Sequence, residues 1–327
     1  MAPAVSGGTG YQMSLDAAAI DLRPLTTMPV KLEMYPTEEG GYLGSGLAAG
    51  YQVFGPALPD VLSEVAVLVV QPDAIARRQV GCCVSFLRPH GLVPVTAVPF
   101  VLELPMARAL WRFQFNAVTA DSLAIGEGVY CHGPSLMLLL RDVDPVPGRP
   151  ACVRLAGLKG SSDPARRGPQ HLRTALTSIN RVFGAVHCPD EPLDILREVG
   201  VMFTGPALVE VFETLRSALD TGSPYDVDSA AESVYASAPA HDLDVARATE
   251  RLLAVLDADG SRPARRLAQR LDAARRQGTP LDWLAFADGL TMLGVDPRGW
   301  DPLLAGSAHV RYELPDTPKL IPSFSGS

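Results

Sequence analysis

Three glycines in the stretch EGGYLGSGLAAGYQVFG stand close to the spacing of a dinucleotide-binding loop. Gly44, Gly46 and Gly50 would let a phosphate approach the backbone, provided that a strand enters the loop and a helix leaves it. The residues that follow, YQVFGPALP, alternate in polarity and stop at prolines, which is typical of a strand. We therefore predict a turned β-loop over residues 39–50 and no phosphate site. Its small side chains would let another backbone pass close by.

Soft metal ligands occur in adjacent pairs, which is a poor spacing for a structural zinc site. Such sites usually take paired ligands two to four residues apart, whereas neighbouring residues on a strand point in opposite directions. We interpret these residues as buried thiols and surface histidines, and we predict no metal and no cofactor. The pairs are Cys82 and Cys83, Cys131 and His132, and His187 and Cys188.

Two carboxylates in RDVDP, Asp142 and Asp144, would share one face of a strand and could hold a divalent ion. A strand that ends in a proline-rich turn explains them as well. The chain has no G-x-S-x-G elbow, no Walker loop and no H-E-x-x-H motif. Its six histidines are scattered, although a catalytic dyad can assemble in space from distant residues. The sequence therefore leaves any catalytic residue unassigned.

One predicted helix is locally basic and could contact a nucleic acid or an acidic partner. It is the segment SRPARRLAQRLDAARRQG, in which leucines occupy the inward stripe. Asp257, Asp259 and Asp272 lie close enough in the sequence to balance this charge, so we favour a solvated helix face. The contact candidates are Arg262, Arg265, Arg266 and Arg270.

The first half of the chain has the pattern of short strands, and the second half has the pattern of helices. Apolar and polar residues alternate in VKLEMY and LWRFQFNA, while GCCVSFL, PSLMLLLRDV and ACVRLAG have strand length between prolines and glycines. After residue 170 apolar residues recur at helical spacing. We predict an α+β chain with a β-rich N-terminal sandwich or barrel, of which a jelly roll is one form, followed by an all-α C-terminal domain.

Changes of composition divide the chain into five segments. We predict an N-terminal arm (1–28), a β-rich domain (29–158), a linker (159–170), a helical domain (171–305) and a C-terminal tail (306–327). Arm and tail lack a period of their own but carry apolar groups, so they could dock on a neighbouring subunit or fold back onto their own. The partner-binding candidates are Tyr11, Met13, Leu22, Leu25, Tyr312, Leu320, Ile321 and Phe324.

Composition and charge limit the compartment and the partners. The net charge is −8 and is spread over both halves, which is no footprint for phosphate neutralisation. The five cysteines are odd in number, which favours reduced thiols over disulfides. The N-terminus lacks a signal-peptide pattern, and no apolar run approaches the roughly 20 residues that span a bilayer. We predict a soluble cytoplasmic chain, or one inside a particle assembled in the cell such as a virion, without membrane contact.

The segments GCCVSFL, WRFQFNAV and GPSLMLLL are similar to the β-core of plant-virus cell-to-cell movement proteins. That family's core is related to virus coat jelly rolls, so the resemblance implies a jelly-roll arrangement here. The aspartate expected after the first strand is absent, because FLRP stands there. No function is carried over from this family.

Since no chemical motif stands out, we predict a structural or assembly protein, a subunit of a larger homo- or hetero-oligomer such as a viral capsid or coat-type shell. The alternative is a soluble enzyme whose small-molecule site lies between the β and α halves. A third reading is nucleic-acid contact through the arginine-rich helix.

Overall fold

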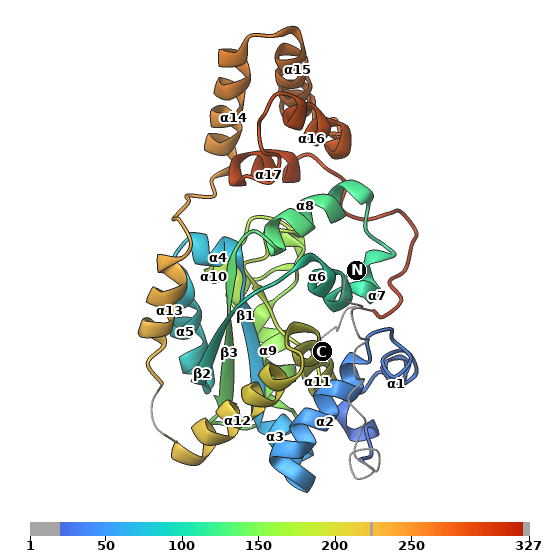
Figure 1. Ribbon diagram of the computed structural model, residues 1–327, viewed down its shortest axis with the longest axis vertical. Coiled ribbons are helices and arrows are strands. Elements are labelled where there is room, and N and C mark those ends of the chain that lie inside the picture. Colours follow the sequence, from blue (N-terminus) through green and yellow to red (C-terminus); the bar gives the residue numbers. More distant parts are fainter. Residues whose placement is uncertain (1–19, 223–224, 323–327) are drawn as a thin grey trace, which may run out of the picture.

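The computed structural model describes residues 20–222 and 225–322, and its centre is a small antiparallel sheet surrounded by helices (Figure 1). Four strands stand in the order β2-β3-β1-β4. They are β1 (Val65–Val70), β2 (Leu92–Val101), β3 (Pro134–Asp142) and β4 (Val186–His187).

The strands of the sheet differ in burial because helices cover the central ones on both faces. The apolar runs of β1 and β3 are almost completely buried, as expected for strands with two covered faces. β2 lies at the edge and carries Pro94 and Pro99, which cannot donate to a ladder. Its register with β3 shifts between Pro94 and Thr96, so one proline lies where the pairing is irregular.

Helices occupy every connection between the strands. Before β1 come α1 (Pro29–Met34), α2 (Tyr42–Phe54) and α3 (Leu58–Glu64). The connections within the sheet hold α4 (Pro72–Ala76), α5 (Val80–Leu87), α6 (Leu104–Leu110), α7 (Arg112–Phe115), α8 (Ala120–Tyr130), α9 (Ala151–Lys159) and α10 (Leu172–Ala175). After β4 come α11 (Pro192–Met202), α12 (Pro206–Thr221), α13 (Val227–Ala236), α14 (Val245–Asp259), α15 (Arg262–Gln277), α16 (Trp283–Met292) and α17 (Trp300–Ser307).

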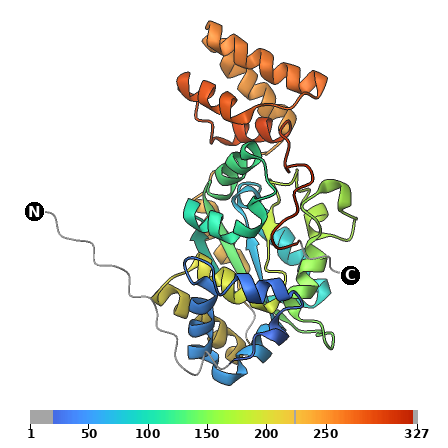
Figure 2. The same cartoon turned by 90° about the vertical axis from the view of Figure 1, so that its right-hand side faces the viewer.

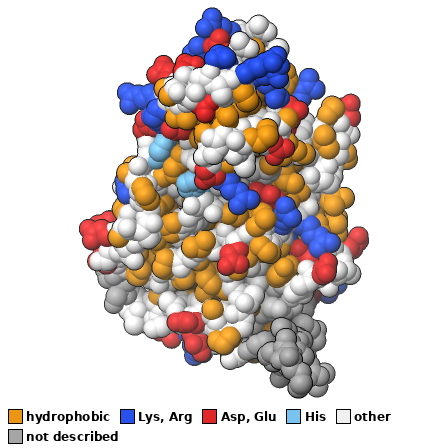
Figure 3. Space-filling model, turned by 45° about the horizontal axis from the view of Figure 1, so that its top comes forward, with side chains coloured by type: hydrophobic (Ala, Val, Ile, Leu, Met, Phe, Trp, Pro, Cys, Tyr) orange, Lys and Arg blue, Asp and Glu red, His pale blue; other side chains and the backbone are white. Residues whose placement is uncertain are grey.

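Helices α14 to α17 form a separate group, here called the helical unit, which stands on α8 at one end of the molecule (Figures 1 and 2). Its own core includes Leu252, Leu271 and Phe286, and α8 contributes Ile125 and Val129 to it. After α17 the chain turns back from the helical unit toward the sheet (dark red in Figure 2). Basic side chains gather over the helical unit in Figure 3, with acidic side chains among them.

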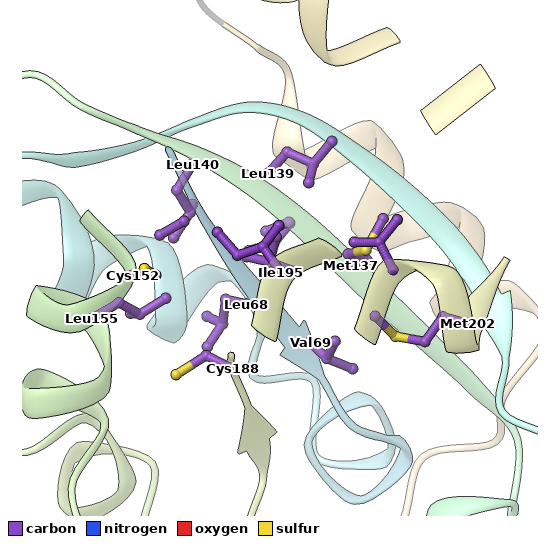
Figure 4. Close-up of a cluster of buried hydrophobic side chains, with 14 of the residues drawn as sticks. Leu68, Val69, Met137, Leu139, Leu140, Cys152, Leu155, Cys188, Ile195 and Met202 are labelled. Atoms are coloured by element: carbon purple, nitrogen blue, oxygen red, sulfur yellow. The ribbon is translucent and has the colours of Figure 1, made fainter. Parts of the chain in front are cut away.

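The larger core lies between the sheet and the helices on its faces. Side chains of the strands, such as Leu68 and Met137, form one buried cluster with Leu155 of α9 and with Ile195 and Met202 of α11 (Figure 4). Helix α11 is enclosed along its whole length, since all eleven of its residues are buried. Residues on both sides of the predicted linker 159–170 therefore share this core. Independent folding of the predicted segments stays a prediction.

The glycine-rich stretch is a helix, so the predicted β-loop over residues 39–50 is wrong. Most of it forms α2, which packs along α11. A Cβ atom on Gly46 would stand 1.9 Å from the Leu196 carbonyl oxygen, and one on Gly200 would stand 2.3 Å from the Tyr42 carbonyl oxygen. The glycines let two helix backbones approach each other, which is the close passage that the small side chains indicated.

The predicted β-rich N-terminal sandwich or barrel is wrong. The structure is mostly helical with a four-stranded sheet. The segments VKLEMY, GCCVSFL, WRFQF and ACVRLAG fall in α1, α5, α7 and α9, which also removes the resemblance to a jelly-roll core. Over four to eight residues an apolar pattern fits either period, and tertiary packing decided for helix. Within the described ranges, no helix is long and apolar enough to cross a membrane.

Candidate functional site

A cavity of about 570 Å³ opens beside β4, between α7 and α8, the connection from α9 to α10, and the chain after α17. Its wall is apolar along the α7 and α8 side and basic along the opposite side. The basic and histidine side chains that line it are Lys31, Lys159, Arg166, His171, Arg173, Arg181, His187, Arg197 and Lys319. The carboxylates that line it are Asp190, Asp194, Glu198 and Glu313. Several of these cations are paired with carboxylates, so a preference for anionic ligands depends on those that have no such partner.

His187 is held at the sheet edge with its ring against a carboxylate. β4 pairs with β1 so that His187 stands opposite Val69, and Glu198 lies two turns into α11. The His187 Nε2 atom is 2.7 Å from Glu198 Oε2. Trp111 meets the imidazole edge-on, with ring centroids 5.4 Å apart. The packing and the hydrogen bond together fix the orientation of the ring.

The contact with Glu198 also decides which nitrogen of His187 can react. An ionised carboxylate only accepts hydrogen bonds, so Nε2 carries the proton. In the neutral ring Nδ1 then keeps its lone pair. Among the described residues Nδ1 has no hydrogen-bond partner. The arrangement supplies a nucleophile or a base whose tautomer is preset by a third group.

Arg173 is a buried cation without a carboxylate. It is 9% exposed, and its three nitrogen atoms donate to the backbone oxygens of Gly184, Gly160 and Val186 at 3.2, 2.9 and 2.8 Å. No carboxylate of the described ranges forms an ion pair with it. Burial lowers its pKa, but a guanidinium stays charged in proteins. Two of its five N–H groups are left for an anion in the cavity.

Lys159 brings a second buried cation to the same wall. Its Nζ donates to the Cys188 carbonyl oxygen at 3.2 Å and to Asp190 Oδ1 at 3.1 Å. Burial opposes its charge, but the Asp190 carboxylate and Cys188 together outweigh burial, so the pKa of Lys159 is raised. Both contacts attach α9 to the segment that follows His187.

The backbone before His187 is held by Asp73 in the first turn of α4. Asp73 Oδ2 accepts the Ala185 N–H at 2.9 Å, and Ala185 has a φ of 63°, a conformation that is unfavourable for a residue with a Cβ atom. Burial raises the pKa of Asp73 to about 6. A buried carboxylate thus stabilises the strained turn that leads into β4.

Buried ion pairs join helix α11 to residues near the N-terminus of the chain. Lys31 Nζ lies 2.7 Å from Glu191 Oε2 and 2.6 Å from Asp194 Oδ2. Arg197 donates to both carboxylate oxygens of Glu38 at 2.7 Å. Buried pairs need good geometry to offset the cost of burial, so these pairs hold α11, which carries Glu198, against α1 and the residues that follow it.

The predicted partner-binding residues lie in several places. Leu25 and Ile321 are buried against the larger core of their own chain. Leu22 is half-buried and Leu320 is exposed, while Tyr312 lines the cavity. Tyr11, Met13 and Phe324 lie outside the described residues. Binding of a partner by these residues stays a prediction.

The other sequence candidates lie away from the cavity or do not form a cluster. Arg262, Arg265, Arg266 and Arg270 are exposed on α15, and their contact with a nucleic acid or an acidic partner stays a prediction. In the ranges 20–222 and 225–322, no group of three or more His, Cys, Asp or Glu side chains could hold a metal ion. Asp142 is buried and paired with Arg154.

Sequence reasoning noticed His187 only as a candidate metal ligand, and it did not single out Glu198 or Arg173. No short motif joins them, since they come from a strand of two residues, a buried helix and the connection before β4. The available signal was charge inside an apolar helix: Asp194, Arg197 and Glu198 interrupt the pattern of α11.

Comparison with known proteins finds similarity to one kind of enzyme. No family model matches the chain. The chain is similar to the nucleoside diphosphate kinase of Ignicoccus hospitalis, with 24% identity over 150 residues, which is 46% of this chain and 95% of that protein.

Solved structures with similarity to the chain carry the same name. The nucleoside diphosphate kinase of Aquifex aeolicus is 19% identical with a TM-score of 0.36, over 44% of this chain and 97% of that one. The enzyme of Encephalitozoon cuniculi is 13% identical with a TM-score of 0.36, over 44% and 91%. The enzyme of Halobacterium salinarum in complex with CDP is 17% identical with a TM-score of 0.35, over 44% and 90%.

The predicted structural or assembly role, with its viral capsid or coat-type shell, is wrong. The shell-type β domain on which it rested is absent from the described residues, and the curated relative is an enzyme, not a capsid or viral structural protein. The comparisons give no support to a virion or to nucleic-acid contact. The findings favour the alternative, an enzyme with a small-molecule site.

Proposed function

We propose that the chain is a phosphotransferase that acts on nucleoside phosphates and carries the phosphoryl group on His187. One observation carries the proposal: an imidazole with a fixed tautomer shares a cavity with a buried arginine that has no carboxylate partner. The name of the Ignicoccus hospitalis relative supplies the substrate class, a nucleoside diphosphate.

The reaction that fits these groups proceeds in two transfers. His187 Nδ1 attacks the terminal phosphorus of a nucleoside triphosphate, a P–N bond forms, and the P–O bond to the leaving diphosphate breaks. A terminal oxygen of a second nucleoside diphosphate then attacks the phosphorus and the P–N bond breaks, which restores the imidazole. The Nε2 proton stays on the ring in both transfers, and the two together return the protein to its starting state, so no other reactant is needed.

The surrounding residues have separate parts in this scheme. Arg173 and Lys159 stabilise the negative charge that develops on the transferring oxygens. Glu198 is a positioning residue, since its carboxylate hydrogen-bonds the imidazole and stabilises the positive charge that the ring gains as it is phosphorylated. The apolar wall with Phe115 and Val118 provides a surface for the rest of the substrate.

A labelling experiment tests the proposal. The full chain is incubated with a nucleoside triphosphate labelled in the terminal phosphate, and acid-labile, base-stable label on the protein is measured. We expect label on the wild type and none on His187→Gln, while the matched control His90→Gln keeps it. Label on His187→Gln equal to that of the wild type, or an unlabelled wild type, would contradict the role of His187.

Glu198→Gln separates positioning from folding. The amide still accepts a hydrogen bond but cannot balance the imidazolium charge, so we expect label to form at least about tenfold more slowly. The circular-dichroism spectrum should not change.

Self-association and a cytoplasmic location are kept as proposals alongside this function. Light scattering on the purified chain measures the first, and fractionation of the source cells measures the second. A monomer at high concentration would contradict self-association and would leave the proposed reaction unaffected.

A further inference from the structure

The chain after the helical unit returns to the cavity as a strap, defined here as residues 311–322. It lies along α7 and the start of α8 (Figures 1 and 2). The Leu314 N–H donates to the Ala117 carbonyl oxygen at 2.8 Å, and the Thr119 N–H donates to the Tyr312 carbonyl oxygen at 3.1 Å. Near its end, the Ile321 N–H reaches the Phe113 carbonyl oxygen at 3.4 Å. Asn116 also donates to the Pro318 carbonyl oxygen at 2.8 Å and accepts the Leu320 N–H at 3.2 Å. The segment is mostly exposed, but hydrogen bonds and the buried Ile321 hold it at several points.

The strap builds one wall of the cavity that contains His187. Five of its residues line this cavity, namely Tyr312, Glu313, Lys319, Ile321 and Pro322. Lys31, from the other end of the chain, lines it as well. A match over 150 residues cannot include both Lys31 and Glu313. Part of the wall is therefore specific to this longer chain.

Glu313 is the carboxylate that the strap brings to the cavity. Its Oε2 lies 2.7 Å from Arg181 Nη1, and its Oε1 lies 3.5 Å from Lys319 Nζ. Arg181 also binds Asp163, at 2.8 Å from its Nη2. Arg181 therefore already has two carboxylate partners, in contrast to Arg173.

The other three carboxylates of the lining have positioning contacts. Asp190 binds Lys159, Asp194 binds Lys31, and Glu198 binds His187. Asp194 and Glu198 lie in the buried helix α11, and Asp190 stands just before that helix with a side chain that is 33% exposed. Glu313 is different because it lies on the mostly exposed strap and not beside His187. A partly exposed side chain of this kind can turn away from its partner while the backbone that carries it stays in place.

We propose that Glu313 occupies on Arg181 the place of an anionic group of the substrate, so that the strap lowers the affinity of the site for multiply charged ligands. A phosphate group that enters displaces the carboxylate and takes Arg181, and the strap then lies against the ligand. The inference rests on the proposed function only for the class of ligand, a phosphate or pyrophosphate group. Glu313 is a specificity-determining residue in this scheme and not a catalytic one.

Inorganic pyrophosphate is the probe for this test, with its dissociation constant measured by calorimetry on the full chain. We expect Glu313→Gln to bind it about five- to tenfold more tightly, since a nearby like charge is removed in a partly exposed site. The gain should shrink at high salt. Arg181→Gln should bind it about tenfold more weakly. The matched control Glu250→Gln, an exposed glutamate on α14, should stay within about twofold of the wild type.

A second variant separates the charge from the attachment of the strap. A chain that ends at Val310 lacks the strap together with the Glu313 carboxylate. It should bind pyrophosphate at least as tightly as Glu313→Gln does. If this truncation gains affinity while Glu313→Gln does not, the carboxylate is not the competitor and the inference is overturned. Equal or weaker binding by both variants, or no binding of pyrophosphate by any of the chains, overturns it as well.

The outcomes for the strap and for the proposed function can be told apart. If Glu313→Gln binds pyrophosphate more tightly but His187 takes no label, the role of Glu313 is supported and the proposed reaction is contradicted. If His187 takes label but Glu313→Gln binds pyrophosphate as the wild type does, the reaction is supported and the role of Glu313 is contradicted.

Discussion

Helices α11 and α15 both carry several charged side chains, but they place them in opposite surroundings. On α15 the arginines face solvent, and two of them, Arg275 and Arg276, pair with Asp272 on the same helix. On α11 every residue is buried, and its charges meet partners from distant parts of the chain. A solvated charge costs little, whereas a buried one is kept only with a partner or a ligand. Charges inside a buried helix are therefore the better guide to a site.

The largest expected effect breaks a buried pair of α11. Arg197→Met removes the partner of Glu38, and the side chain of Glu38 is completely buried. We expect the free energy of unfolding to fall by about 3–5 kcal/mol, because an uncompensated carboxylate is left inside. Chemical denaturation measures this loss. Arg266→Met on the exposed face of α15 is the matched control and should change stability by less than about 0.5 kcal/mol. Similar losses of unfolding free energy in the two variants would contradict the difference between the buried charges of α11 and the solvated charges of α15.

The next effect concerns Asp73, which holds the turn before β4, and it depends on pH. Its folded pKa, about 6, lies above the ordinary 3.8 because of burial. Between these values the folded chain binds the proton and the unfolded chain does not, so stability falls as pH rises from about 4 to about 6 and is level above that. The decline amounts to about 3 kcal/mol.

Asp73→Asn has no such proton and should lack this decline. The difference in unfolding free energy between variant and wild type should therefore grow in the variant's favour from pH 4 to pH 7. Parallel curves over this range would show that Asp73 is ionised throughout or does not titrate in the folded chain.

A smaller effect is expected where α2 approaches α11. Gly46→Ala places a Cβ atom against the Leu196 carbonyl oxygen, and a backbone atom cannot move aside as a side chain can. We expect a loss of about 1–3 kcal/mol from overpacking. Gly81→Ala, which meets no atom within 4 Å and lies on α5, is the control and should be neutral or slightly stabilising. Thermal unfolding of both variants checks this; equal melting temperatures would mean that the two helices can separate freely.

The smallest effect belongs to the start of α15. The Ser261 side chain accepts the Ala264 N–H, so Ser261→Ala should cost about 1 kcal/mol. The change lies far from the cavity, and labelling of His187 should stay at the wild-type level. A Ser261→Asp variant should retain the cap and the stability. Lost labelling in Ser261→Ala would show that the helical unit influences the site.

Some elements of this protein follow from local sequence alone. The run VAVLVV and the run SLMLLL form strands that are buried on both faces, because a short continuous apolar segment between turn signals has few other solutions. Helix α15 begins after Ser261 and ends before Gly278, at the residues whose chemistry favours a cap and a stop. In these cases the determining interactions lie within a few residues of each other.

Tertiary structure alone decided the rest. The segments at 80–87 and 112–115 carry apolar patterns too short to separate period two from 3.6, and packing on the sheet made them helices. The site has the same character: Glu198, Arg173 and Glu313 meet His187 or its cavity only after β4 pairs with β1 and the strap returns. A sequence records each charge but not the solvent around it. Burial, which makes those charges informative, comes from contacts between residues far apart in the chain.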